Sequence, residues 1–144
     1  MSFPPEVVLH KYFIWCNKMR THFDEQLGQF KPEMEWADPV ALNMNLYMSY
    51  WYGGLYVVIE GWQSLGLGDA EIDELLKSSN VELLRRYRNG VFHFQHEYFD
   101  DRFTGFMTKG QNAVDWVRAL NRAFGRYFLT WFESRKDATP PAEA

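Results

Sequence analysis

The chain has 144 residues and a formal net charge of −4, which fits a single domain and excludes the overall basic field of a general polyanion binder. Any contact with RNA must therefore come from a local basic patch. The hydrophobic share of 47% and the aromatic share of 18% predict a substantial core, together with aromatic surface that needs a partner. Cys16 is the only cysteine, and the N-terminus carries no signal-peptide pattern, so we expect a cytoplasmic protein without disulfides.

The first half of the chain predicts two long helices. Apolar residues at helical spacing indicate a helix that ends near Leu27: Val8, Tyr12, Trp15, Met19 and Phe23. Asp38-Pro39 has the residue types that begin a second helix, in which Gly53-Gly54 implies close approach of a neighbour. Residues 40–59 are long enough to span a membrane. Their polar residues and the lack of flanking Lys or Arg instead favour a helix of a soluble bundle.

The second half predicts shorter helices around a polar connection. A helix over residues 70–77 is capped by Asp69, and the next helix follows a capping box formed by Ser79 and Glu82. Residues 99–110, with the pair Asp100-Asp101, have the character of a loop, and residues 112–133 form the last helix. We therefore predict an all-α, up-and-down bundle of four to five helices over residues 1–135, with a disordered tail over residues 136–144.

Arg88-Asn89-Gly90-Val91-Phe92-His93 is the segment with the clearest chemical content. In a straight helix the side chains of Arg88 and His93 would point about 140° apart. Asn89 and Gly90 both tolerate the left-handed conformation that ends helices, so a break there would bring the pair together. Arginine binds phosphate bidentately and histidine transfers protons near neutral pH. Together they suit metal-independent cleavage of RNA by its own 2′-hydroxyl.

With Asn89 directly after Arg88 and four residues between Arg88 and His93, the segment resembles the motif of the HEPN family (higher eukaryotes and prokaryotes nucleotide-binding). Arg86 also precedes His93, but Tyr87 follows it, so Arg88 fits better. The resemblance implies a HEPN-like helical bundle, a homodimer that pairs two motifs, and metal-independent ribonuclease activity of the toxin-antitoxin or defence type. It further implies that His93 is the general base or acid, Arg88 the phosphate clamp and Asn89 an orienting residue.

Charged residues around this segment suggest further binding roles. Arg85 and Arg86 complete the dense basic cluster, and we expect Glu60 to pair with Arg88 or Arg86, unless Glu60 lies in water at the edge of its helix. Three acidic residues would repel a phosphate backbone if they lined the same groove: Glu97, Asp100 and Asp101. A second arginine set, spaced four apart, is expected to be a solvated helix face: Arg118, Arg122 and Arg126.

Other functions remain open at this stage. The chain could be a non-catalytic module that binds RNA, a nucleotide or a protein such as an antitoxin, or Arg88 and His93 could simply hydrogen-bond inside a packed turn. A metal-dependent enzyme would need His93, His96 and Glu97 on one helical face, with His10 or His22 as a further ligand. We favour the ribonuclease, with RNA or a nucleotide and a second copy of the chain as partners, and expect no metal or other cofactor.

Overall fold

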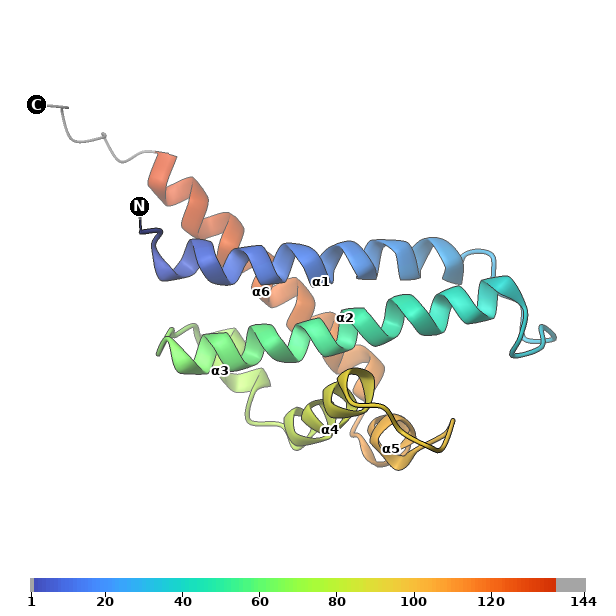
Figure 1. The fold of residues 1–144 in the computed structure, drawn as a ribbon. Helices are drawn as coiled ribbons and strands as arrows, with labels where there is room; N and C mark the ends of the chain where they lie inside the picture. Colours follow the sequence, from blue (N-terminus) through green and yellow to red (C-terminus); the bar gives the residue numbers. More distant parts are fainter. Residues whose placement is uncertain (1, 137–144) are drawn as a thin grey trace, which may run out of the picture.

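The computed structural model describes residues 2–136, which contain helices and no strand. The prediction of an all-α bundle is confirmed, although the helices number six. They are α1 (Pro5–Leu27), α2 (Pro39–Ser64), α3 (Ala70–Leu75), α4 (Asn80–Phe92), α5 (Asp101–Lys109) and α6 (Ala113–Lys136). α1 and α2 lie side by side and antiparallel, α6 crosses them obliquely, and α4 and α5 pack at the far side of α2 (Figure 1).

The pairing of α1 with α2 depends on small residues at the contact. The side chain of Asp38 caps α2 by accepting a hydrogen bond from the amide of Val40 at 2.9 Å, with Pro39 at the first helical position. A Cβ atom at Gly54 would lie 2.7 Å from Cβ of Cys16 on α1. The predicted close approach of a neighbouring helix at this glycine is therefore confirmed, and Cys16 is a buried core residue.

Buried tryptophans connect α2 to α6, and both of these helices to α3, through hydrogen bonds. Trp51 and Trp62 on α2 and Trp116 on α6 are each at most 8% exposed. Each indole N–H still has an acceptor: Asn121 for Trp51 at 3.0 Å, Asp73 for Trp62 at 3.1 Å, and a backbone carbonyl of α3 for Trp116 at 3.0 Å. The core therefore buries large rings without leaving their polar atoms unsatisfied.

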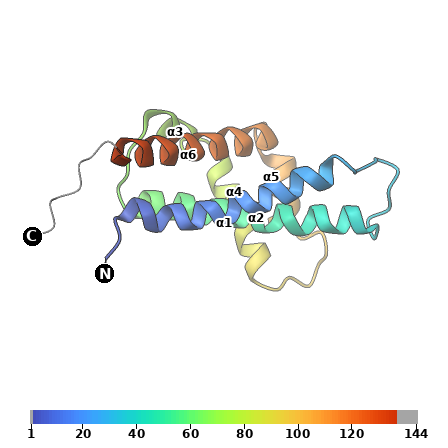
Figure 2. The ribbon, with the colours of Figure 1, turned by 90° about the horizontal axis from the view of Figure 1, so that it is seen from above.

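α6 lies on one side of the α1–α2 pair, as Figure 2 shows.

The start of α4 differs from the predicted capping box. Ser79 already has helical backbone angles and makes no side-chain capping bond; the hydroxyl of Ser78 accepts from the amide of Asn80 instead, at 3.0 Å. Asn80 is fully buried, and its side-chain amide exchanges two hydrogen bonds with the backbone of Gln111, at 2.8 and 2.9 Å. This pair, the Asn80–Gln111 clasp, ties the start of α4 to the connection between α5 and α6.

The expectation of a loop over residues 99–110 is wrong, because α5 occupies most of this segment. Asp100 is its N-cap and accepts a hydrogen bond from the amide of Arg102 at 2.9 Å. Phe106 is completely buried, and Phe103 packs on the ring of Tyr87 from α4. The acidic pair therefore begins a helix that covers α4.

α4 does not break at Asn89-Gly90, which overturns the expected route to a joined Arg88–His93 pair. The helix continues to Phe92, and Gly66 is the only glycine with positive φ within residues 2–136. Gly90 is buried because α5 approaches it closely: an added Cβ would lie 3.0 Å from the ring of Phe103. Gly90 therefore allows α5 to approach α4 closely, and it does not form a turn.

Residues 2–136 include no helix that combines the length and the apolar character needed to cross a membrane. The last helix continues past the predicted end at Glu133 and takes in Lys136, the first residue of the expected tail. The remainder of that predicted tail, residues 137–144, lies outside the described residues.

Candidate functional site

Arg88 lies on the side of α4 that faces α2. Its guanidinium carbon is 4.7 Å from the centre of the Tyr56 ring, and its Nη1 is 3.4 and 3.5 Å from the two carboxylate oxygens of Glu60. Its Nε donates to the side-chain oxygen of Asn89 at 3.1 Å. The predicted pairing of Glu60 with Arg88 is confirmed. The Glu60 side chain is 54% exposed, so the pair is formed at the surface and not in the interior.

His93 is exposed and follows the last residue of α4. Its backbone N–H donates to the carbonyl of Asn89 at 3.0 Å, and its carbonyl accepts from Nε2 of Gln95 at 2.8 Å. Over residues 2–136, no hydrogen bond joins the side chains of Arg88 and His93, so the packed-turn alternative is absent as well. Both residues instead bind Asn89. Arg88 donates to the side-chain oxygen of Asn89, and the backbone N–H of His93 donates to its backbone carbonyl.

Each arginine of the basic cluster has a carboxylate neighbour. Nε of Arg85 donates to Glu82 at 2.8 Å, and Nη2 of Arg86 donates to Asp101 at 3.0 Å, so Arg86 is not the partner of Glu60. Both arginine side chains are more than a third exposed. Exposed ion pairs contribute little net stability, so a bidentate phosphate oxyanion can replace the carboxylate at low cost.

The acidic residues after the motif have local cationic partners. A hydrogen bond from Arg86 and the charge of Lys109 lower the pKa of Asp101, while the backbone amide and guanidinium of Arg102 lower the pKa of Asp100. Both carboxylates are therefore held in the charged form by groups of α4 and α5. Their charges are balanced locally, which weakens the repulsion of phosphate expected from the sequence.

The arrangement required for the metal-dependent alternative is not formed. His93, His96 and Glu97 follow the end of α4, so they do not share a helical face as their spacing suggested. His10 packs on two phenylalanine rings of α6, and His22 on the ring of Tyr47. Within residues 2–136, no group of three or more suitable side chains could hold a metal ion.

An exposed aromatic surface includes Phe92, which lies one turn after Arg88 on α4. We define the aromatic face by four residues whose exposed fractions lie between 37% and 58%: Tyr12, Trp15, Tyr50 and Phe92. They line a cavity of about 500 Å³ between α1, α2 and α4. Beyond Tyr50 the surface continues into a cleft of about 670 Å³ next to Phe94 and Phe99.

The sequence did not place this face. Tyr12 and Trp15 belong to an apolar helical stripe, and such a stripe normally indicates core. The one signal was the high aromatic share of 18%, which predicted an aromatic surface. Contiguous exposed apolar surface often marks a site of protein association, whereas single exposed apolar residues are common on any protein surface.

The chain matches no protein-family profile, no curated protein and no solved structure. The resemblance to the HEPN family therefore stays a prediction from the Arg88-Asn89…His93 motif.

Proposed function

We propose that this chain is one subunit of a homodimeric, HEPN-like, metal-independent endoribonuclease that uses Arg88, Asn89 and His93. The observation that carries the proposal is the adjacency of the motif to the aromatic face. Phe92 belongs to that face and lies between Arg88, one turn before it, and His93, directly after it. A second chain seated on the aromatic face would therefore bury the motif at the interface.

The dimer supplies what one chain lacks. His93 follows the last residue of α4, and within residues 2–136 its side chain makes no hydrogen bond with Arg88 or with any other residue. Two copies related by a two-fold axis bring two histidines and two arginines to one groove. One histidine then accepts the proton of the 2′-hydroxyl, whose oxygen attacks phosphorus, while the other protonates the departing 5′-oxygen. The products are a 2′,3′-cyclic phosphate and a free 5′-hydroxyl.

Arg88 acts on the phosphate in this scheme. The ring of Tyr56 and the oxygen of Asn89 already orient its guanidinium. When phosphate arrives, the long contacts to Glu60 at 3.4 and 3.5 Å are replaced by shorter charge-assisted hydrogen bonds. Negative charge that develops on the phosphate oxygens is thereby stabilised. Arg85 and Arg86, one turn or less away on α4, extend the contact to neighbouring phosphates.

The test is cleavage of single-stranded RNA in the presence of a chelator, with the end groups identified. His93→Ala should reduce the rate by about 10²–10⁴-fold. His96→Ala, which removes an exposed histidine three residues further on, should leave the rate unchanged. Wild-type protein that leaves a broad panel of RNAs intact, or equal losses in both variants, contradicts the proposal.

A second experiment tests the role of the dimer. Phe92→Ser removes a side chain that is 53% exposed in the single chain, so the fold should survive. We expect this variant to sediment as a monomer and to lose cleavage. Val114→Ser, at a similarly exposed apolar position on α6, is the matched control. This variant should remain dimeric and should keep its cleavage activity. Full cleavage by a monomeric Phe92→Ser protein would refute the dimer site.

The pairing of Arg88 with Glu60 favours one alternative, a non-catalytic module that binds RNA, a nucleotide or a partner protein such as an antitoxin. In such a module the ion pair fixes α4 against α2, and His93 is dispensable. Salt-sensitive RNA binding that survives His93→Ala, without turnover by the wild type, would identify this function.

A further inference from the structure

A basic cleft of about 380 Å³ lies between α1 and α6. Three arginines from the two helices line it, namely Arg20, Arg118 and Arg122, and Asn17 and Gly125 lie among them. On α1, Asn17 faces this cleft, whereas Tyr12 and Trp15 line the aromatic face. The cleft is therefore separate from the Arg88–His93 segment.

Two of the arginines are held in place by one carboxylate. Asp24 accepts from Nη1 of Arg20 at 2.8 Å and from Nη2 of Arg118 at 2.7 Å. Nε of Arg20 donates to Asn17 at 2.8 Å, and the Arg118 guanidinium lies 5.3 Å from the centre of a Trp51 ring. About 30% of each arginine side chain is exposed, so the two guanidiniums are preorganised at the wall of the cleft.

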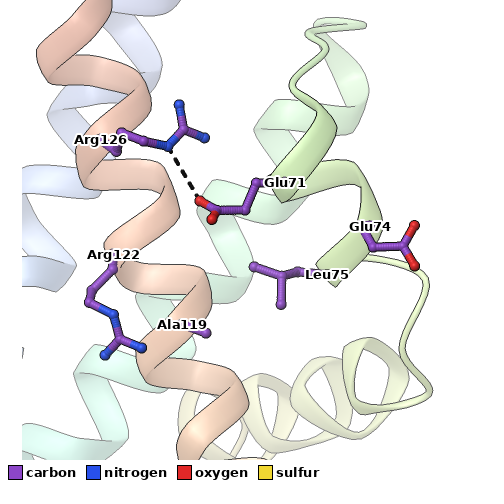
Figure 3. A pocket seen from close by; sticks show the side chains of 6 residues that line it. All are labelled: Glu71, Glu74, Leu75, Ala119, Arg122 and Arg126. Atoms are coloured by element: carbon purple, nitrogen blue, oxygen red, sulfur yellow. Dashed lines mark hydrogen bonds and ion pairs between the residues drawn. The ribbon is translucent and has the colours of Figure 1, made fainter.

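Arg122 has no hydrogen bond or ion pair with any residue of 2–136, unlike its neighbours one turn away on α6. Arg126 pairs with Asp69 and Glu71. Figure 3 shows that Arg122 also lines a pocket between α3 and α6, which it shares with Glu71 and Glu74 of α3 without an ion pair to either. Arg122 and Arg126 are exposed, as expected of a solvated arginine face, whereas Arg118 is half-buried and paired with Asp24.

The cleft has unused hydrogen-bond donors. Within residues 2–136, Asp24 is the carboxylate that hydrogen-bonds to the arginines of this cleft, while Asp115 acts on Arg118 only through its charge, and Glu71 and Glu74 border Arg122 on the side of α3. Within residues 2–136, Nη2 of Arg20, Nε of Arg118 and every nitrogen of Arg122 lack an acceptor. Gly125 adds no side chain, which leaves the space beside Arg122 open. A purely structural ion-pair cluster would not need a third, unpaired arginine.

We propose that this cleft binds a phosphate-class oxyanion, either a phosphate or a diphosphate group. A tetrahedral oxyanion accepts several N–H donors at once and so matches the unused donors of the three guanidiniums. A single carboxylate would repeat the role that Asp24 already has. This site is independent of the proposed ribonuclease, because it shares no residue with the Arg88–His93 segment.

The test is calorimetric titration of the full-length protein with metal-free pyrophosphate. We expect saturable binding that Arg122→Gln weakens by about tenfold or more, the effect of losing one charged hydrogen-bond donor. Arg122 forms no hydrogen bond or ion pair within residues 2–136, so this substitution should leave the melting temperature of the unliganded protein unchanged. Arg135→Gln, which removes a charge from the end of α6 outside the cleft, is the matched control and should bind like the wild type.

A parallel titration with a nucleoside diphosphate distinguishes the source of the phosphate. Tighter binding than pyrophosphate identifies a nucleotide ligand, and equal binding shows that the site recognises the phosphates alone. Absence of saturable binding for both compounds at millimolar concentration overturns the proposal. Equal weakening by Arg122→Gln and Arg135→Gln overturns it too, since only net charge would then matter. Neither result bears on RNA cleavage, which His93→Ala tests separately.

Discussion

Gly54→Ala is expected to destabilise the protein although alanine is the better helix former. In an exposed helix interior this exchange would gain about 1 kcal/mol. At Gly54 the new Cβ would lie 2.7 Å from Cβ of Cys16, whereas carbon atoms in contact are normally about 3.5–4.0 Å apart. The obstructing atom is fixed to the backbone of α1, so no rotamer change relieves the clash, and α1 and α2 must separate by about 1 Å.

Overpacking of this kind costs about 1–3 kcal/mol, and the rigid obstacle places this case at the upper end. After the gain in helix propensity, we expect a net loss of about 1–2 kcal/mol in the free energy of unfolding, or a fall of roughly 3–6 °C in melting temperature for a domain of this size. Thermal and urea denaturation followed by circular dichroism measure both quantities.

Gly125→Ala is the matched control because it makes the same exchange on α6 without a clash. The nearest atom to its added Cβ is a ring carbon of Phe13 at 3.6 Å, an ordinary contact. This variant should gain about 0.5–1 kcal/mol. If Gly54→Ala proves as stable as Gly125→Ala, the close contact of α1 with α2 does not limit the packing, and the reasoning fails.

Three further predictions concern buried or paired polar groups. Asn80→Ala should lower the free energy of unfolding by about 2–4 kcal/mol, because it leaves both backbone groups of Gln111 without their partner; an effect below about 1 kcal/mol in urea denaturation would argue against the clasp. Burial raises the pKa of Cys16 to about 12, so its thiol should resist a disulfide reagent at pH 8 until the protein unfolds, and rapid labelling of folded protein would contradict this. Partial burial alone would raise the pKa of Asp24, but the hydrogen bonds and charges of Arg118 and Arg20 outweigh it and lower the pKa. The Asp24 carboxylate therefore stabilises the fold above pH about 4 and loses this effect as the pH falls through its lowered pKa. Asp24→Asn should cost about 1 kcal/mol at pH 7, and its difference from the wild type should shrink below pH 4.

The long helices could be predicted from the sequence because their signals are local. Asp38-Pro39 begins α2 where the residue types require it, and Asp69 caps α3 through a 3.1 Å bond to the amide of Ile72. α5 was missed because the acidic pair Asp100-Asp101 suggested a loop. The apolar spacing of Phe103 and Phe106 behind a capping Asp100 was the signal that would have found it.

The candidate site could be predicted only as a set of residues. The Glu60–Arg88 pair followed from the charge pattern, but the break at Asn89-Gly90 did not form. Local preference for a turn was overridden by packing of Phe103 against Gly90, which no local pattern contains. The aromatic face and the α1–α6 cleft depend on how distant helices are placed, so the sequence could suggest them only through composition and the spacing of the arginines.

The Asn80–Gln111 clasp should determine how the Arg88–His93 segment unfolds locally. Its two hydrogen bonds join positions 31 residues apart, and between them lie α4, the Arg88–His93 segment and α5. A segment closed at both ends and packed internally tends to exchange its amide hydrogens as one cooperative unit. Arg88 and His93 would then gain or lose their arrangement together, in one local folding step distinct from the opening of α1 and α2.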